Sequence, residues 1–276
     1  MRVEDLDTQR CKPHFIKGII EDLQWFGLSW DEGPGSQPCS TVTPLDCGPY
    51  EQQQRMDLYI SAWKRLYEGG YIYPSPYSRK DVARALSAPH EEHNGEPIFP
   101  VSLRPDMSTL PAGLEGPGKQ TWRFRVPDDR VLSFTDGYMG ECSYTAGVDF
   151  GDFVVWRADG FPSYEMAVVV DDIHMQITEV VRGGDLLMST ARQILLYEAL
   201  GQAGVLPAFF HCPLVRDGEG KRLAKRSLPS SLYTLRGRST SNETTPWTAE
   251  RIREELLPDL QPVIDSIDAK LKPLIE

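Results

Sequence analysis

The chain has 276 residues, of which 40% are hydrophobic and 25% charged, a composition that is ordinary for a globular protein. Its formal net charge of -11 argues against nucleic-acid binding through overall charge, so a polyanionic partner would need a local basic patch. No apolar run approaches the ~18 residues of a membrane-spanning helix, no signal peptide is recognisable, and five cysteines without a C-x-x-C pair favour the reducing cytoplasm.

The first ten residues, MRVEDLDTQR, are predicted to end a strand and to contribute to a functional site. Met1 to Val3 have strand character, and Glu4, Asp5 and Asp7 place three carboxylates beside two arginines. A chain terminus is usually poorly ordered and without such features.

Two amphipathic helices are predicted in the next segments. Residues 11–30 carry apolar side chains at helical spacing, and a surface loop rich in Gly, Pro, Ser and Thr follows over 33–49. Residues 50–70 repeat the helical pattern and end on Gly69 and Gly70. The buried stripe of this second helix is predicted to contain Met56, Tyr59, Ile60, Trp63 and Leu66.

Residues 71–140 are rich in proline and are predicted to form a mixed insertion. Residues 150–212 alternate between strand and helix, which favours a parallel α/β sheet. In this region "ITEVVRG" is expected to be a buried parallel strand. "STARQILLYEALG" is expected to be a helix with a capping box at Thr190 and Gln193, stopped by Gly201.

A basic segment runs from Arg216 to Arg238. Seven Lys or Arg side chains stand there against two acids, a local balance of +5. Such a loop can close on a triphosphate and stabilise charge that develops on a phosphoryl group. The alternative is an ordinary solvated basic loop.

Four further residues carry side chains with possible chemistry. Arg182 follows an apolar run and precedes two glycines, where a ligand carboxylate could bind, although a surface ion pair is the alternative. Tyr164 faces either a pocket or the core. Asp171 and Asp172 could act as an acid/base pair or hold a loop by hydrogen bonds.

Two histidines, His90 and His93, stand three positions apart in the predicted insertion. No cysteine lies within 40 residues on either side, which argues against a metal site.

Six stretches resemble the class I glutamyl-tRNA synthetases in order and approximate spacing, over residues 1 to about 230. They are "RVEDLDTQR", "GLSWDEGP", "PYEQQQRMDLY", "DFVVWRADGFPSYEMAVVVDD", "ITEVVRGGDLLMSTARQILLYEALG" and "KRLAKRS". Within that family the chain is most similar to the short paralogues, the glutamyl-Q tRNA(Asp) synthetases, which lack the anticodon-binding domain.

The resemblance implies an α/β fold with a Rossmann-like parallel sheet, a mixed insertion and a short C-terminal helical segment. Residues 1–70 would be the first part of the catalytic domain and 71–140 the insertion. Residues 141–230 would be the second part, with the lysine-signature loop, and 231–276 the C-terminal segment.

The resemblance also implies an enzyme that uses ATP with Mg2+ to convert glutamate into glutamyl-adenylate and passes the glutamyl group to tRNA. In the short paralogues the acceptor is the queuosine base of tRNA(Asp). The alternatives are a catalytic fragment that charges tRNA(Glu), and a non-catalytic binding protein.

Site residues follow from the motif match. Glu4 would receive the α-amino group of glutamate, and Tyr164 and Arg182 would line the glutamate pocket, with Arg182 facing a carboxylate. The ATP-binding residues would be Arg222, Leu223 and Lys225, with Lys225 as the catalytic lysine at the phosphates.

Two departures from the family pattern stand out. Ser75, Tyr77, Phe99 and Ser102 occupy the positions where the short paralogues often hold zinc, so no zinc is predicted. The family's first βα unit, with its His-Ile-Gly-His-like motif, is not recognisable before Arg2. We therefore expect a monomer of limited stability, or a partner that supplies this unit.

Overall fold

The computed structural model describes residues 1–35, 47–78, 81–82, 98–214, 236, 248–251 and 254. The chain divides into two compact units, one made of residues 1–54 with the chain from Cys212 onward, and the other of Arg55–His211. Within the described residues, every helix is too short or too polar to cross a bilayer.

The N-terminal segment pairs with the chain before the second helix, as its strand character predicts. Val3 and Glu51 form a parallel bridge, in which the Val3 N–H donates to the Tyr50 carbonyl at 2.9 Å and the Gln52 N–H donates to the Val3 carbonyl at 3.1 Å. The buried Asp5 carboxylate accepts from the Gln53 N–H at 2.9 Å. Residues around Glu4 are thus tied to the rest of their unit.

Helix α1 spans Pro13–Trp25 and confirms the first predicted helix. Proline suits the first turn because its missing N–H has no partner to lose there. Two apolar side chains of α1 are largely exposed, Phe15 at 59% and Ile19 at 52%. The 3₁₀ helix Gln52–Arg55 then leads to α2, Met56–Glu68.

The predicted buried stripe of α2 is confirmed for three of its five residues. Tyr59, Trp63 and Leu66 are fully buried, while Met56 and Ile60 are half-buried. The indole rings of Trp63 and Trp122 pack edge to face with their centroids 4.9 Å apart. Trp122 lies on a strand, so this contact joins α2 to a sheet in the core.

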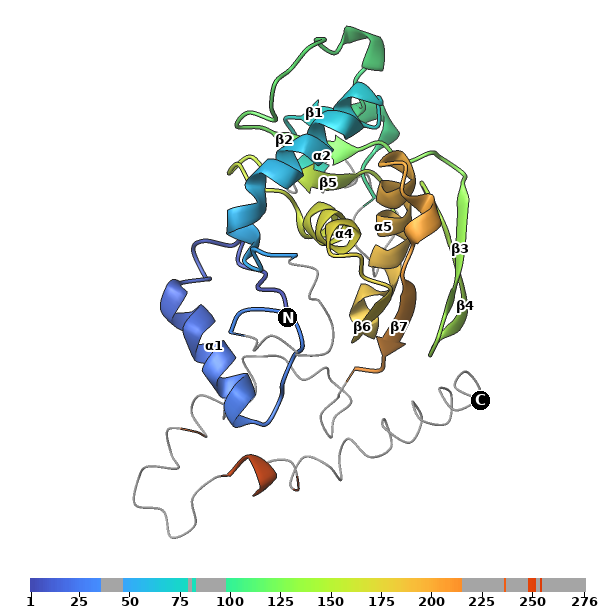
Figure 1. Cartoon of the computed structure of the whole chain (residues 1–276). Coiled ribbons are helices and arrows are strands. Elements are labelled where there is room, and N and C mark those ends of the chain that lie inside the picture. Colours follow the sequence, from blue (N-terminus) through green and yellow to red (C-terminus); the bar gives the residue numbers. More distant parts are fainter. Residues whose placement is uncertain are drawn as a thin grey trace. The chain divides into compact units, whose positions relative to one another are not determined.

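Among its described residues, the unit from Arg55 to His211 contains two sheets (Figure 1). The first has the order β1-β2-β5 and is antiparallel throughout. The second has the order β4-β3-β7-β6, in which β3 pairs antiparallel with β4 and parallel with β7. Their bounds are β1 Ile72–Ser75, β2 Thr121–Phe124, β3 Val131–Asp136, β4 Gly140–Thr145, β5 Phe153–Trp156, β6 Glu179–Gly183 and β7 Ala208–Cys212.

The predicted parallel pairing is confirmed for β3 and β7, whereas β3–β4 and the whole first sheet are antiparallel. β3 and β4 are joined by three residues, and so short a connection permits only antiparallel pairing. Between β3 and β7 the chain passes through two helices, α4 (Tyr164–His174) and α5 (Leu187–Ala199), and this crossover permits parallel pairing. α4 packs against α5, α2 and β5 (Figure 1).

Strand β6 is wrongly predicted as a buried strand. Its side chains alternate between exposed and half-buried, and Val181 is 69% exposed. In the order of the described strands it lies at the end of its sheet. A short apolar run does not distinguish a buried strand from an edge strand, because neighbours decide burial.

The predicted capping box of α5 is also wrong. The helix begins at Leu187, directly after the 3₁₀ helix Gly184–Leu186, so Thr190 and Gln193 lie inside it. Both side chains are buried and bind partners from other elements. The stop at Gly201 is confirmed by its φ of +69°, a conformation that glycine adopts without strain. The remaining 3₁₀ helices are Val101–Leu103, Met107–Thr109 and Ala203–Val205.

A buried ion pair joins the start of α2 to the end of α4. Arg55 Nε donates to Asp171 Oδ1 at 2.6 Å, and both side chains are fully buried. The Tyr59 hydroxyl lies 2.9 and 3.0 Å from the two oxygens of the same carboxylate. Asp171 therefore holds two helices together, whereas the predicted structural role was to hold a loop.

Candidate functional site

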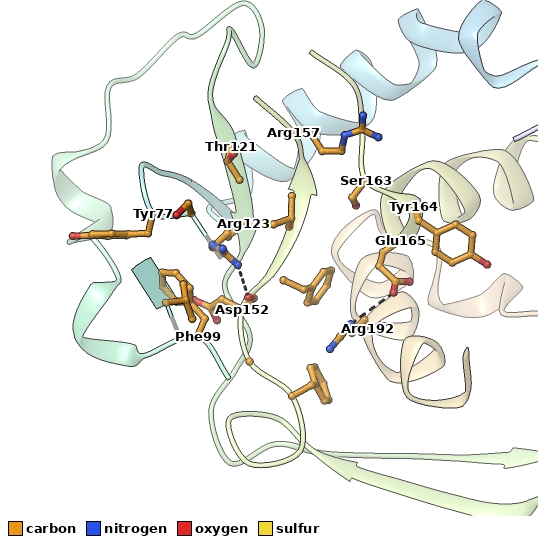
Figure 2. A pocket seen from close by; sticks show the side chains of 16 residues that line it. Tyr77, Phe99, Thr121, Arg123, Asp152, Arg157, Ser163, Tyr164, Glu165 and Arg192 are labelled. Carbon is orange, nitrogen blue, oxygen red and sulfur yellow. Dashed lines mark hydrogen bonds and ion pairs between the residues drawn. The ribbon is translucent and has the colours of Figure 1, made fainter. Parts of the chain in front are cut away.

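The unit from Arg55 to His211 contains a pocket of about 570 Å³ (Figure 2). Strands β2 and β5, the start of α4 and one residue of α5 contribute to its walls. It is lined by Tyr77, Ser78, Val82, Phe99, Thr121, Arg123, Phe150, Gly151, Asp152, Phe153, Val154, Arg157, Ser163, Tyr164, Glu165 and Arg192.

One wall combines aromatic rings with a buried arginine. The rings of Tyr77 and Phe99 lie 6.3 Å apart, and the Arg123 guanidinium carbon lies 4.3 Å from the Phe99 ring centre. Arg123 Nε donates to Ser75 Oγ at 3.2 Å, and its Nη1 donates to the Asp152 carbonyl at 3.1 Å. A cation over an aromatic face is a favourable pair when it is shielded from water.

This wall does not fit a zinc ion. Ser75, Tyr77 and Phe99 present a hydroxyl, a phenol and a phenyl ring where the family pattern places ligands, and the Arg123 cation stands among them. Among the described residues, no cluster of three or more His, Cys, Asp or Glu side chains could hold a metal.

The carboxylate of Asp152 stabilises this wall of the pocket through several hydrogen bonds. It accepts from Arg104 Nε at 2.8 Å and Arg104 Nη2 at 2.7 Å, from the Val126 N–H at 2.9 Å, and from the Tyr73 hydroxyl. Burial raises the pKa of Tyr73, and the adjacent carboxylate raises it further, so the phenol stays a donor. The network keeps the backbone around Asp152 in place.

Gly151 is expected to be essential to the packing of this wall. A Cβ at this position would lie 2.7 Å from the Phe99 backbone nitrogen and 2.8 Å from Ile98 Cγ2. We expect Gly151→Ala to destabilise the protein by about 1–3 kcal/mol, because the chain at Phe99 must move. Urea unfolding measures this loss. Gly116→Ala is the matched control, since its Cβ would meet nothing within 4 Å, and equal losses in the two variants would contradict the expectation.

The opposite wall carries a buried carboxyl group at the start of α4. Glu165 is 9% exposed; its Oε2 accepts from Gln193 Nε2 at 2.8 Å, and its Oε1 lies 3.9 Å from Arg192 Nη1. Glu165 and Arg192 point toward one another from α4 and α5 (Figure 2). Burial raises the pKa of Glu165, and the Ser189 hydroxyl, the Arg192 charge and Gln193 only partly offset this.

The raised pKa predicts a pH-dependent stability contribution from Glu165. The folded state binds this proton more tightly than the unfolded state, so the contribution is fully present below the unfolded pKa and is lost as the pH rises through the folded pKa. We expect Glu165→Gln to become more stable relative to wild type between pH 4 and pH 8, as thermal melts at each pH would show. A stability difference that is constant over this range would contradict the expectation.

Arg182 lies near the end of β6, and neighbouring side chains hold its guanidinium. Its Nε donates to His211 Nε2 at 2.9 Å, and its Nη2 donates to Thr190 Oγ1 at 2.8 Å and, more weakly, to the Leu186 carbonyl at 3.4 Å. The guanidinium carbon lies 5.6 Å from the ring centre of Phe209. Among the described residues, no acceptor lies within hydrogen-bond distance of Nη1.

His211 is itself held by a second buried side chain. Its Nδ1 lies 2.6 Å from Asp136 Oδ2, and both side chains are fully buried. Burial opposes ionisation of Asp136, but hydrogen bonds from the Met139, His211 and Tyr138 N–H groups and the His211 ring lower its pKa below the usual value. Asp136 is therefore an anion that faces His211.

Only some of the predicted site residues lie at the pocket. Tyr164 is 39% exposed and lines the pocket, whereas Arg182 does not. Glu4 belongs to the other unit, where it is exposed and its Oε1 lies 3.3 Å from Arg2 Nη2. Outside the described residues lie Arg222, Leu223, Lys225, His90 and His93.

Of the cations counted in the basic segment, Arg236 lies within the described residues. Its Nη2 lies 3.1 Å from Glu21 Oε2, and its Nε lies 3.1 Å from Asp22 Oδ1. This arginine therefore forms ion pairs with α1.

Sequence reasoning missed Asp136, His211, Glu165 and Arg192. One signal was present for His211, because it is a lone imidazole in the apolar run "AFFHC" and a buried histidine needs partners for both ring nitrogens. No local signal joins Asp136 to it, since the two lie 75 residues apart.

Comparison with known proteins identifies the family. The family described as "tRNA synthetases class I (E and Q), catalytic domain" matches residues 1–245. The chain belongs to this family. The predicted membership of the class I aminoacyl-tRNA synthetase-type ligases is thereby confirmed, and the family uses ATP.

Two curated relatives illustrate the similarity. A glutamyl-Q tRNA(Asp) synthetase of Symbiobacterium thermophilum is 44% identical over 245 residues, which is 88% of this chain and 72% of the relative. A glutamate–tRNA ligase of Corynebacterium jeikeium is 38% identical over 240 residues, which is 85% of this chain but 46% of the relative. Both synthetase types are thus similar to this chain.

A solved structure supports the fold. The glutamate tRNA ligase of Elizabethkingia meningosepticum, crystallised in complex with its amino acid, matches with a TM-score of 0.64 and 31% identity, over 82% of this chain. The chain spans 44% of the length of that ligase. The α/β fold of the class I synthetase catalytic domain is confirmed at this level, with mixed sheets where a parallel one was predicted.

Proposed function

We propose that this chain activates glutamate with ATP and transfers the glutamyl group to the queuosine base of tRNA(Asp). The observation that carries the proposal is the Arg182 guanidinium, whose Nε and Nη2 are held by protein groups while Nη1 is left to a ligand. A guanidinium presented in this way suits a carboxylate. The glutamyl-Q tRNA(Asp) synthetase of Symbiobacterium thermophilum, whose name states this activity, is 44% identical to the chain over 88% of its length.

In this proposal the substrate-binding residues are Glu4, Tyr164 and Arg182. Glu4 receives the α-amino group, and Arg182 binds a carboxylate. In the activation step a substrate carboxylate oxygen attacks the α-phosphorus of ATP and pyrophosphate leaves. This reaction needs positioning and charge stabilisation, and no protein nucleophile. Arg222, Leu223 and Lys225 bind the ATP, which carries Mg2+, and Lys225 stabilises the phosphates.

The pocket beside Tyr164 supports a nucleobase acceptor. Tyr77 and Tyr164 are not fully buried, and each offers an aromatic face on which a planar base can stack. The buried carboxyl of Glu165 adds a hydrogen-bonding group to the wall.

We also propose the domain boundaries that the family resemblance implies. Residues 1–70 and 141–230 form the catalytic domain, 71–140 the insertion, and 231–276 a C-terminal helical segment. We place the reaction in the cytoplasm, where tRNA and ATP are present, with the chain acting as a monomer.

Glutamate-dependent ATP–pyrophosphate exchange tests the first step. We expect exchange with L-glutamate and little with L-glutamine or L-aspartate. Glutamate binding without exchange would support a non-catalytic binding protein, and the absence of both would overturn the proposal.

Transfer of labelled glutamate tests the acceptor. We expect labelling of tRNA(Asp) that contains queuosine, and none of tRNA(Asp) without the modification. Labelling of tRNA(Glu) would instead show a glutamyl-tRNA synthetase, the type to which the Corynebacterium relative belongs.

A further inference from the structure

We infer that Asp136 and His211 are positioning residues. They hold the Arg182 guanidinium in one orientation, in which Nη1 faces a carboxylate group of the glutamate substrate. The inference rests on the proposed function. Asp136 ends β3, His211 lies on β7 and Arg182 on β6, so the chain of contacts crosses three strands that are neighbours in one sheet.

The contacts determine which nitrogen of His211 carries the proton. Arg182 Nε–H can only donate, so the His211 Nε2 that lies 2.9 Å away must present a lone pair. The single proton of the neutral ring is therefore on Nδ1, 2.6 Å from Asp136 Oδ2. A protonated ring would direct a second N–H at Arg182 Nε, which has no lone pair, so that its only acceptor among the described groups would be Thr190 Oγ1 at 3.3 Å.

Asp136 is well suited to hold this tautomer. Its Oδ1 accepts from the Met139 N–H at 2.8 Å, the Tyr138 N–H at 3.0 Å and the His211 N–H at 3.2 Å, which leaves Oδ2 for the imidazole. The carboxylate is thus oriented by the β3–β4 turn and by β7. An oriented acceptor selects the tautomer and direction of the histidine beside it.

The other contacts of Arg182 complete the restraint. Thr190 Oγ1 and the Leu186 carbonyl accept from Nη2, and the Phe209 ring lies beside the guanidinium. With Nε and Nη2 bound to separate elements, the plane of the guanidinium is fixed. A fixed donor binds a carboxylate more tightly than a mobile one, because less conformational freedom is lost on binding.

Two substitutions at His211 separate positioning from folding. His211→Gln can place an amide oxygen near the position of Nε2, whereas His211→Asn can reach Asp136 but not Arg182. We expect the KM for glutamate in ATP–pyrophosphate exchange to rise about tenfold in His211→Asn and Asp136→Asn, and less in His211→Gln. The kcat and the KM for ATP should change by less than about threefold.

Tyr59→Phe is the control for destabilisation. It removes buried hydrogen bonds to Asp171, in the same unit but away from Arg182, and should lower the Tm without changing the KM for glutamate. An unchanged KM for glutamate in a folded His211→Asn variant would overturn the inference, as would equal rises in His211→Asn and Tyr59→Phe.

A second measurement does not depend on activity. Nitrogen-15 NMR of the histidine side chains in the wild-type chain should show His211 as the Nδ1–H tautomer at pH 7.5, and Arg182→Met should shift its Nε2 resonance. An Nε2–H tautomer or a charged ring would overturn the inference. If the wild type shows no exchange with glutamate, the proposed function fails, while the tautomer and its response to Arg182→Met still decide whether this pair holds Arg182.

Discussion

Arg182→Met should lower the kcat/KM of glutamate-dependent ATP–pyrophosphate exchange by about a hundredfold or more. The substitution removes the charged donors of Nη1 that we assign to a substrate carboxylate. A hydrogen bond to a charged group contributes about 1.5–3 kcal/mol, and each ~1.4 kcal/mol corresponds to a tenfold change in rate. Most of the loss should be in the KM for glutamate.

Arg182→Lys should be intermediate, because one ammonium group cannot reach His211, Thr190 and a ligand at the same time. The matched control is Arg130→Met. Arg130 is an exposed arginine of the same unit, paired with Glu198 at 2.7 Å, and removing such a pair costs little. If Arg182→Met retained wild-type kcat/KM, its proposed role in binding glutamate would be wrong.

Asp171→Ala should be the most destabilising of the changes considered, at about 3–5 kcal/mol in the free energy of unfolding. It removes the carboxylate that lies 2.6 Å from the fully buried Arg55 guanidinium and accepts from the Tyr59 hydroxyl. Urea unfolding at pH 7 measures the loss. Tyr59→Phe, which keeps the ion pair, should lose only about 1–2 kcal/mol.

The comparison between these two variants tests the reason for the effect. If Asp171→Ala lost no more than Tyr59→Phe, then the buried charge on Arg55 would be satisfied in another way. The Arg55–Asp171 pair would then not be what joins α2 to α4.

Local patterns predicted the helices well and the strands less well. The helices α1 and α2 were found from apolar spacing, and the stop of α5 from Gly201, because hydrogen bonds between residues four apart and a glycine φ are local properties. The predicted burial of β6 was wrong, and so was the predicted parallel direction for the pairs β1–β2, β2–β5 and β3–β4. Both depend on which strands become neighbours, which the local sequence does not encode.

In the candidate site, too, the sequence suggested some residues, while others became apparent only from the fold. Tyr164 and Arg182 were proposed as site residues because they stand in motifs whose order resembles a known family. Gln193 and Thr190 were assigned to a helix cap, since their spacing fits one, but they bind Glu165 and Arg182 instead. A side chain that can satisfy a local pattern can also satisfy a distant partner, and only the fold shows which.

The family and the helices could be predicted from the sequence alone, because the order of motifs and the spacing of apolar residues can be read along the chain. The residues that we assign to glutamate and ATP are a proposal from the same motifs. Only the tertiary structure revealed that Asp136, His211 and Arg182 form one line of contacts, and that Asp171 neutralises Arg55. These partners lie 75, 29 and 116 residues apart. Contacts over such separations arise from the pairing of strands and the packing of helices. A local pattern of residues therefore does not predict them.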